Sequence, residues 1–287
     1  MERSHSGLVR WSRKPVCLKG HRGFKSLPLR QDNLASHMER NNFDALSRDY
    51  DAARRGYPVA LFKHLKKIIP NKESQILDVG CGTGISTRQL RCYGFKSIGA
   101  DKGLEMIRIA KKHGGGISYF VAPASKLPFR EHQFDVITAF TAFHWFDDIK
   151  SVNEIKRVLK KGGVFIAVQK TLAKSEDKRV EKLQRRQRVI MDKYFGLKSD
   201  AAKNHDAAAV LRKNGFVHIT RRPFYFQEKY TLSQAMLRVK SMSNWNLLSD
   251  AKKEKYYEDL YNLYKKNLIG RYVVRSCVAK MVVGYPP

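Results

Sequence analysis

Residues 75–86, Gln-Ile-Leu-Asp-Val-Gly-Cys-Gly-Thr-Gly-Ile-Ser, restrict the fold of this 287-residue chain more than any other stretch. The apolar run within residues 76–79 predicts a short buried strand, and a helix-forming segment begins at Ser86. Between them, three glycines stand at every second position: Gly80, Gly82 and Gly84. Glycine allows positive φ and a close approach of the backbone to a ligand, and a helix start offers unpaired N–H groups. A strand, glycine turn and helix in this order predict a nucleotide-type site in an α/β fold.

Two carboxylates accompany the glycines. Asp78 stands two residues before the first glycine, and Asp101 ends the next predicted strand, residues 96–101. Asp101 lies roughly 20 residues beyond the glycine turn, which is the spacing of an acid that binds ribose hydroxyls. The structural alternative for Asp101 is an N-cap of the following helix. The third glycine comes one residue too early for the G-x-G-x-x-G pattern of dinucleotide-binding folds, so a different nucleoside ligand is indicated.

The pattern Asp78-x-Gly80-x-Gly82-x-Gly84 resembles motif I of the class I S-adenosylmethionine-dependent methyltransferases. Strands and helices alternate through residues 75–168, which favours a doubly wound parallel sheet. The resemblance implies a Rossmann-like α/β sheet of seven strands, mostly parallel with the last strand antiparallel, with a helical cap and C-terminal helices. It also implies S-adenosylmethionine as the cofactor. The cofactor-binding residues predicted in this way are Tyr50, Arg55, Asp78, Gly80, Gly82, Gly84, Asp101, Lys102, Ala124, Ser125 and Ala139.

Residues 122–129 are similar to the adenine-binding stretch of this family. The family usually carries an acidic or polar residue before the alanine and an acid after it, whereas this chain has Pro123 and Ser125 around Ala124. The backbone N–H of Ser125 remains available to the adenine ring. The substitution predicts weaker cofactor affinity or a different hydrogen-bond partner.

Residues 50–58 look like the lead-in of a subfamily related to the trans-aconitate and cantharidin methyltransferases (methyltransferase type 11). In that group the segment caps the methionine end of the cofactor, which implies cap roles for Tyr50, Arg55 and Tyr57, and Tyr57 is also a substrate candidate. The alternative is an amphipathic helix that only covers the sheet.

Residues 141–147, Thr-Ala-Phe-His-Trp-Phe-Asp, carry the most recognisable signature of the same subfamily. At the carboxyl end of a parallel strand, His144 and Trp145 are expected near the reactive end of the cofactor. His144 is a candidate general base; the alternative is a histidine that shapes the pocket and is hydrogen-bonded to the backbone. Trp145 could offer a π-face to a sulfonium; the alternative is that it packs in the core. A later segment resembles a substrate-lining stretch and makes Asn244 and Trp245 substrate candidates, or the end of a packed helix.

Residues 1–40 differ from the rest of the chain because they are rich in arginine and serine and poor in acids. They read as a basic disordered tail, a transit-like segment, or an extension upstream of a start at Met38. Residues 41–287 are predicted to form the methyltransferase domain, with a core over 70–230 and substrate-lining helices over 231–287.

Two predictions concern the end of the sheet. Residues 216–219 and 224–228 are expected to pair as the antiparallel edge that finishes it. The apolar stretch 272–283 is broken by Arg275 and Lys280 and reads as a strand or a core helix rather than a membrane anchor.

Charge and cysteine content limit the partners and the compartment. The chain has 56 Lys and Arg against 26 Asp and Glu, a net charge of +30, which favours anionic partners such as acidic metabolites, nucleic acid or anionic lipid. No base-reading motif accompanies the charge. The four cysteines lack metal-site or disulfide spacing, so we expect no metal site and a reducing compartment. The predicted location is cytoplasmic, or mitochondrial if residues 1–37 are a transit segment.

Three functions fit these observations. The first is methyl transfer to a small-molecule acceptor, favouring an anionic one and a carboxylate or other oxygen, since a carboxylate needs no general base. The second is an RNA- or protein-directed methyltransferase, motivated by the charge. The third is a catalytically weak cofactor-binding module, suggested by Pro123 and Ser125.

Overall fold

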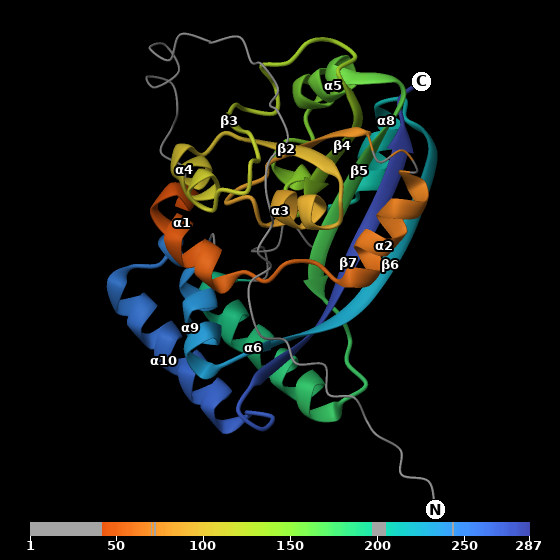
Figure 1. Cartoon of the computed structure of the whole chain (residues 1–287). Helices are drawn as coiled ribbons and strands as arrows, with labels where there is room; N and C mark the ends of the chain where they lie inside the picture. Colours follow the sequence, from red (N-terminus) through yellow and green to blue (C-terminus); the bar gives the residue numbers. More distant parts are fainter. Residues whose placement is uncertain (1–41, 70, 72, 197–204, 243) are drawn as a thin grey trace, which may run out of the picture.

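The computed structural model describes residues 42–69, 71, 73–196, 205–242 and 244–287. Its strands form one sheet with the order β3-β2-β1-β4-β5-β7-β6 (Figure 1). The strands are β1 (Gln75–Val79), β2 (Lys96–Asp101), β3 (Tyr119–Val121), β4 (Phe134–Phe140), β5 (Leu159–Leu172), β6 (Val217–Tyr230) and β7 (Val273–Tyr285). Strands β1 to β5 pair in parallel, and β7 runs antiparallel to both β5 and β6. This confirms the predicted doubly wound, mostly parallel sheet with its last strand antiparallel.

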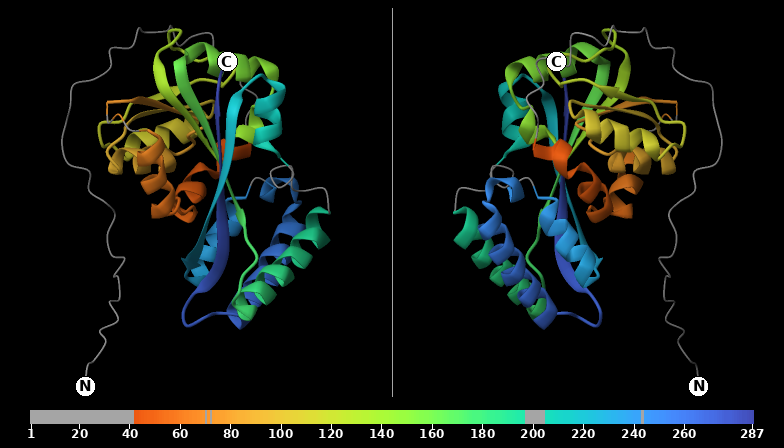
Figure 2. Two further views of the ribbon diagram at one scale, coloured as in Figure 1. Left: turned by 90° about the vertical axis from the view of Figure 1, so that its right-hand side faces the viewer. Right: turned by 90° about the vertical axis from the view of Figure 1, so that its left-hand side faces the viewer.

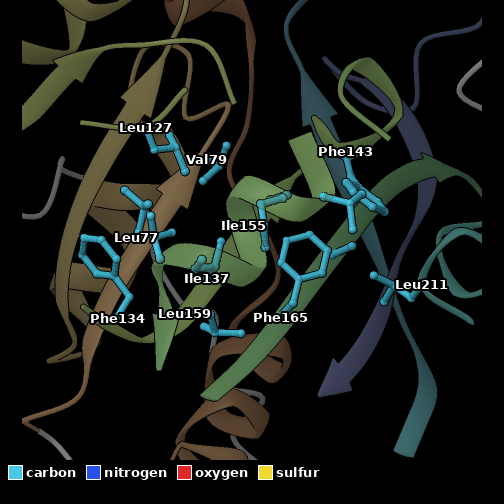
Figure 3. Close-up of a cluster of buried hydrophobic side chains, with 14 of the residues drawn as sticks. Leu77, Val79, Leu127, Phe134, Ile137, Phe143, Ile155, Leu159, Phe165 and Leu211 are labelled. Atoms are coloured by element: carbon cyan, nitrogen blue, oxygen red, sulfur yellow. The ribbon is translucent and has the colours of Figure 1, made fainter. Parts of the chain in front are cut away.

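Helices cover both faces of the sheet. They are α1 (Asn42–Ala53), α2 (Val59–Ile68), α3 (Ile85–Cys92), α4 (Leu104–Lys112), α5 (Ile149–Val158), α6 (Lys178–Phe195), α8 (Ala207–Lys213), α9 (Leu232–Lys240) and α10 (Asp250–Lys266). On one face, Ile155 of α5 and Leu211 of α8 pack with sheet residues such as Phe165 (Figure 3). On the other face, Phe62 of α2 and Leu90 of α3 are fully buried. Residues of alternate parity point to opposite faces of a strand, so both faces of the central strands are apolar.

Helices α6, α9 and α10 pack together as a second lobe. This lobe lies below the shorter strands, where β5, β6 and β7 extend past them (Figures 1 and 2). Tyr256 and Leu260 of α10 are buried against Leu183 of α6, Met236 of α9 and Val273 of β7. Helix α1 joins the two parts, because it packs against both α9 and α4. Within the described part of the chain, no helix has the length and apolarity needed to cross a bilayer.

The end of the sheet differs from the sequence prediction. The expected antiparallel pairing of residues 216–219 with 224–228 is wrong, because β6 is one continuous strand whose partner is β7. Residues 273–285 therefore complete the sheet, so the predicted region of helices over 231–287 contains a strand as well. The physical reason is burial: β7 is apolar on both faces and suits an inner position, whereas β6 is largely exposed and carries Pro223, which edge strands tolerate. The predicted tail, residues 1–40, lies outside the described residues.

Candidate functional site

A cavity of about 360 Å³ lies where the chain leaves the carboxyl ends of the parallel strands. The turns after β1, β2, β3 and β4 contribute to its wall, and so do the lower parts of β5, β6 and β7. Residues following α1 and a side chain of α9 close it from the other lobe. The order of the sheet reverses between β1 and β4, and ligands of open α/β sheets bind at such a reversal.

The glycine turn gives this cavity its backbone wall. Gly80, Gly82 and Gly84 all have positive φ, at 69°, 53° and 78°. A Cβ at Gly80 would overlap Ala142, and a Cβ at Gly84 would overlap the ring of Tyr119. At Gly82 the atom nearest to an added Cβ would be 4.0 Å away, so this glycine faces open space. Gly80 and Gly82 line the cavity, whereas Gly84 lies behind it and permits close packing.

Asp101 is held against this turn. Its Oδ2 accepts a hydrogen bond from Gly82 N–H and its Oδ1 accepts one from Gly103 N–H, both at 2.8 Å. Each carboxylate oxygen has two lone pairs, so both can accept a further bond from a ligand hydroxyl. Asp101 and the adjacent Lys102 line the cavity. A carboxylate with this geometry, next to a glycine whose Cβ side is open, fits the ribose of a nucleoside.

Asp78 has a different position from Asp101, because it is fully buried and lies outside the cavity lining. It accepts hydrogen bonds from the hydroxyls of Ser86 (2.7 Å), Thr87 (2.8 Å) and Thr138 (2.9 Å). Burial raises the pKa of Asp78 to about 6, and the three hydroxyl donors oppose this rise. Asp78 thus ties β1, α3 and β4 together beneath the glycine turn.

The remaining predicted cofactor residues divide into two groups. Ala124 and Ser125 line the cavity together with Pro123, which places the predicted adenine stretch at its wall. Ala139 is fully buried in the sheet core and is not part of the lining.

The lead-in predicted as a cap does lie over the cavity, where Tyr50, Arg55 and Tyr57 contribute to the lining. Gln89 of α3 clamps Tyr57: its Oε1 accepts from Tyr57 N–H at 2.8 Å, and its Nε2 donates to Tyr57 O at 3.2 Å. Lys170 Nζ, from β5, donates to the carbonyl oxygens of Arg55 (2.6 Å) and Gly56 (3.2 Å). Burial strongly raises the pKa of Tyr57, so its hydroxyl stays protonated and acts as a hydrogen-bonding group.

Thr141, the first residue after β4, was not predicted as a site residue. Its φ is 54°, a conformation that strains a β-branched side chain. Its Oγ1 lies 2.8 Å from Tyr57 Oη and accepts a hydrogen bond from the backbone N–H of Lys170 at 3.2 Å. Glycine would make the same turn without strain, so the feature that threonine adds is the hydroxyl that links the lead-in to β5.

The structure separates the two residues predicted near the reactive end. Trp145 lines the cavity and keeps 57% of its surface exposed. His144 is not part of the lining; its ring lies 6.1 Å from that of His205. Burial lowers the pKa of His144, and the nearby His205 adds to this effect. His144 is therefore not positioned to act on a ligand in this cavity.

Asn244 and Trp245 also lie outside the cavity lining. The ring of Trp245 lies 6.3 Å from Tyr256 and 6.5 Å from Tyr257, within the apolar cluster of the helical lobe. The structure thus places Trp245 in packing rather than at the predicted substrate position.

A cluster of charged side chains that the sequence did not predict lines the cavity where β5, β7 and β6 border it, on the other side of β1 and β4 from Asp101. Glu228 of β6 is its centre: Oε1 accepts from Lys170 Nζ at 2.9 Å, and Oε2 accepts from Arg275 Nη1 and Tyr230 Oη at 3.0 Å each. Burial alone would raise the pKa of Glu228, but Lys170 and Arg275 outweigh it and lower the pKa to about 2. Glu228 is therefore ionised throughout the physiological range.

Two further cations of this cluster lack such a partner. Arg238 of α9 lines the cavity, and no carboxylate among the described residues pairs with it. Burial lowers the pKa of Arg238 to about 10, and the neighbouring Arg275 and Arg54 contribute to this lowering. Arg54 donates to Ser241 O at 3.2 Å and also lines the cavity. One carboxylate, Glu228, therefore faces several guanidinium and ammonium groups, and this end of the cavity carries excess positive charge.

No local motif announces this cluster, because its members come from separate elements. Arg54, Lys170, Glu228, Arg238 and Arg275 are spread over more than two hundred residues. The net charge of +30 was the only sequence signal related to them.

Comparison with known proteins agrees with this site. Residues 77–167 match the family model described as "Methyltransferase domain". An uncharacterized methyltransferase of Schizosaccharomyces pombe is 26% identical over 76% of this chain and 84% of its own length. A malonyl-[acyl-carrier protein] O-methyltransferase of Hamiltonella defensa is 31% identical over 43% of this chain, and a demethylmenaquinone methyltransferase of Chlorobaculum parvum is 36% identical over 37%. The chain spans less than half the length of these last two relatives, 48% and 44%.

Solved structures show the same fold. A methyltransferase from Anaeromyxobacter dehalogenans superposes with a TM-score of 0.55 at 22% identity, covering 82% of this chain and 99% of that one. A methyltransferase from Anabaena variabilis gives 0.53 at 18% identity, covering 78% and 98%. These two structures confirm the Rossmann-like fold. The matched domain and the methyltransferase relatives confirm the predicted enzyme class and S-adenosylmethionine as the cofactor.

Proposed function

We propose that this S-adenosylmethionine-dependent methyltransferase transfers the methyl group to an oxygen, in particular a carboxylate oxygen, of a small anionic molecule. The observation that carries the proposal is Arg238: a partly buried guanidinium without an acidic partner among the described residues shares one cavity with Gly82 and Asp101. A buried cation without a counter-charge is costly, and an anionic acceptor would supply that charge when it binds.

The chemistry asked of the chain is mainly alignment. The bound cofactor supplies an activated methyl group, and the chain's residues orient the acceptor and exclude water. Asp101 would hold the ribose hydroxyls, the turn at Gly80 and Gly82 would face the nucleoside, and Pro123 to Ser125 would lie along the adenine. A carboxylate acceptor is already nucleophilic and needs no base. This agrees with a lining that contains no histidine within the described part of the chain.

The rival functions have weaker support. An RNA- or protein-directed reaction would need room for a large substrate, whereas Arg54 and Arg238 are partly buried and line a cavity of about 360 Å³. The hypothesis of a cofactor-binding module without catalysis is based on the presence of Pro123 and Ser125. Both residues line the cavity, where the backbone N–H of Ser125 can serve the adenine. The resemblance of residues 50–58 and 141–147 to the trans-aconitate and cantharidin group supports an anionic acceptor, and one relative bears the name of an O-methyltransferase.

The first experiment tests cofactor binding. Purified full-length protein is titrated with S-adenosylmethionine and S-adenosylhomocysteine in a calorimeter and in a thermal-shift assay. We expect binding and stabilisation by both, and their loss in Asp101→Ala. If neither nucleoside binds, the proposed function is overturned at its root.

The second experiment tests the acceptor. The protein is incubated with labelled cofactor and a panel of mono-, di- and tricarboxylates, phosphorylated alcohols and neutral alcohols. We expect label in a base-labile methyl ester of a carboxylate, and strong reduction in Arg238→Met. The matched control is Arg212→Met, an exposed arginine on α8 away from the cavity. Transfer to neutral alcohols alone would overturn the anionic acceptor while leaving the methyltransferase intact.

A reducing compartment suits this proposal, because the four cysteines of the chain lack the spacing of a disulfide framework. We place the reaction in the cytoplasm on this ground. A mitochondrial location depends on residues 1–37, which lie outside the described residues.

A further inference from the structure

Helix α6 carries the largest excess of positive charge among the described helices. The helix contains seven Lys and Arg and two Asp and Glu. The neighbouring helix α10 contains five and four, so its charges are mixed. Because α6 and α10 pack together in the same lobe (Figure 2), the difference is not a general property of that lobe.

The cations of α6 point away from the protein. At about 100° per residue, four of them fall within one narrow arc opposite the buried side: Lys178, Lys182, Arg185 and Arg186, here called the basic face. All four are exposed, whereas Val180, Leu183, Gln184 and Gln187 are buried.

The basic face is not neutralised by neighbouring acids. Among the described residues, no carboxylate forms an ion pair with any of its four members. Asp177, at the N-cap of α6, pairs with Arg179, and Glu181 accepts a hydrogen bond from Ser175 N–H at 2.8 Å. Asp177 and Glu181 are thus engaged elsewhere, and the four cations of the basic face have no paired carboxylate among the described residues.

The packing of α6 decides which kind of polyanion the basic face fits. A helix that binds a membrane surface must insert an apolar face into the lipid. The apolar side of α6 is already buried against α10 and β7, and its exposed large apolar residue is the single Val189. A surface of cations alone can neutralise successive phosphates of a nucleic-acid backbone without inserting anything.

We infer that the basic face of α6 is a sequence-independent binding surface for the phosphate backbone of a nucleic acid, separate from the methyl-transfer cavity. None of its four residues lines that cavity. The surface therefore tethers the enzyme to nucleic acid without making nucleic acid the methyl acceptor.

The experiment measures binding of the full-length protein to a fluorescein-labelled single-stranded oligouridine by anisotropy, between about 50 and 200 mM salt. An oligothymidine probe distinguishes RNA from DNA, and vesicles of phosphatidylcholine with phosphatidylserine test the membrane alternative. With four phosphate contacts, the logarithm of the association constant is expected to fall with the logarithm of salt with a slope of about −3.

The test variant is Lys182→Glu/Arg185→Glu/Arg186→Glu. Its matched control is Lys252→Glu/Lys255→Glu/Lys266→Glu on α10, which changes the net charge equally at exposed positions. We expect the α6 variant to bind at least about tenfold more weakly with a flatter salt slope, and the α10 variant to bind like the parent. Unchanged binding of S-adenosylhomocysteine verifies that both variants fold.

Three outcomes overturn the inference. Equal weakening in both variants would assign the binding to net charge alone. Binding to anionic vesicles without binding to either oligonucleotide would assign the surface to membranes. No binding of the parent protein to any probe would show that the basic face is simply solvated. None of these results affects the proposed methyl transfer, which is measured separately.

Discussion

The two ends of the cavity are built in opposite ways. The cofactor end comes from short contiguous segments, the glycine turn with Asp101 and its neighbours, and backbone N–H groups supply most of its hydrogen bonds. The other end, which we propose binds the acceptor and call the acceptor end, comes from side chains of β5, β6, β7 and α9, and ion pairs centred on Glu228 hold it together. The cofactor end depends on backbone conformation, whereas the acceptor end depends on balanced buried charge. We therefore expect substitutions at the acceptor end to affect folding as well as binding.

The largest expected effect on stability is that of Glu228→Gln, because Lys170 and Arg275 both pair with this carboxylate. Glu228→Gln leaves Lys170 and Arg275 without their carboxylate, and removing one partner of a buried ion pair costs about 3–5 kcal/mol of unfolding free energy. Chemical denaturation at neutral pH measures this loss. The control is Glu254→Gln at an exposed position of α10, which we expect to leave the midpoint unchanged. A Glu228 variant as stable as the parent would show that the acceptor end does not rest on charge balance.

The same carboxylate predicts a pH dependence. The pKa of Glu228 is about 2 in the folded protein against 4.5 for an unperturbed glutamate. Since the folded pKa is the lower one, its stabilisation is complete above about pH 4.5 and is lost as the pH falls towards 2. Denaturation midpoints measured across this window should fall less steeply in Glu228→Gln than in the parent.

The next effect separates the two ends. Asp101→Ala removes the acceptor of two ribose hydrogen bonds, and bonds to a charged group are worth about 1.5–3 kcal/mol each. We expect S-adenosylhomocysteine to bind at least about a hundredfold more weakly by calorimetry. The loss of stability should be smaller, about 1–3 kcal/mol, because the N–H groups of Gly82 and Gly103 lose their acceptor. Asp101→Asn retains one acceptor oxygen and should lose less. Equal loss of stability and affinity would mean that Asp101 serves the fold rather than the cofactor.

Arg238→Met should weaken binding of the acceptor and leave binding of the cofactor unchanged. Loss of one charge-assisted contact predicts a KM for the anionic acceptor about tenfold to a hundredfold higher, while S-adenosylhomocysteine binds as in the parent. Arg238→Lys keeps the charge and should lie between the two. If Arg238→Met weakens cofactor and acceptor alike, the division of the cavity into two ends is incorrect.

This division also explains how far the sequence predicted the site. The strand, the glycines and Asp101 lie within 27 residues, and their spacing follows from the backbone geometry of one β-turn-α unit, so they were predictable. Arg238 and Glu228 line one cavity only because β6 and β7 are long antiparallel strands and α9 packs back onto α1. No periodicity within one segment encodes such a meeting.

The sequence predictions for His144 and for the last strand were incomplete for the same reason: both depend on contacts between distant segments. His144 and Trp145 are neighbours in sequence, yet the short 3₁₀ turn Phe143–Trp145 directs Trp145 into the cavity lining and His144 towards His205. The last strand was uncertain because its apolar pattern, broken by Arg275, fits a strand or a helix. Arg275 is tolerated inside the sheet only because Glu228 lies on the adjacent strand, which is a tertiary fact.

The smallest effect concerns Thr141, which lies between the two ends. Thr141→Val and Thr141→Gly both remove the hydroxyl that contacts Tyr57 and Lys170, but only glycine relieves the strain of the positive φ. Relief of strain worth about 1–3 kcal/mol, less about 0.5–1 kcal/mol for the flexibility of glycine, predicts that the glycine variant is more stable than the valine variant by about 1 kcal/mol. Denaturation midpoints measure this difference. Both variants should lose methyl transfer to the same extent, because both release the Tyr57 hydroxyl, and Thr141→Ser should retain it. A glycine variant with full activity would mean that the hydroxyl is dispensable and that the strained turn alone holds the lead-in against β4.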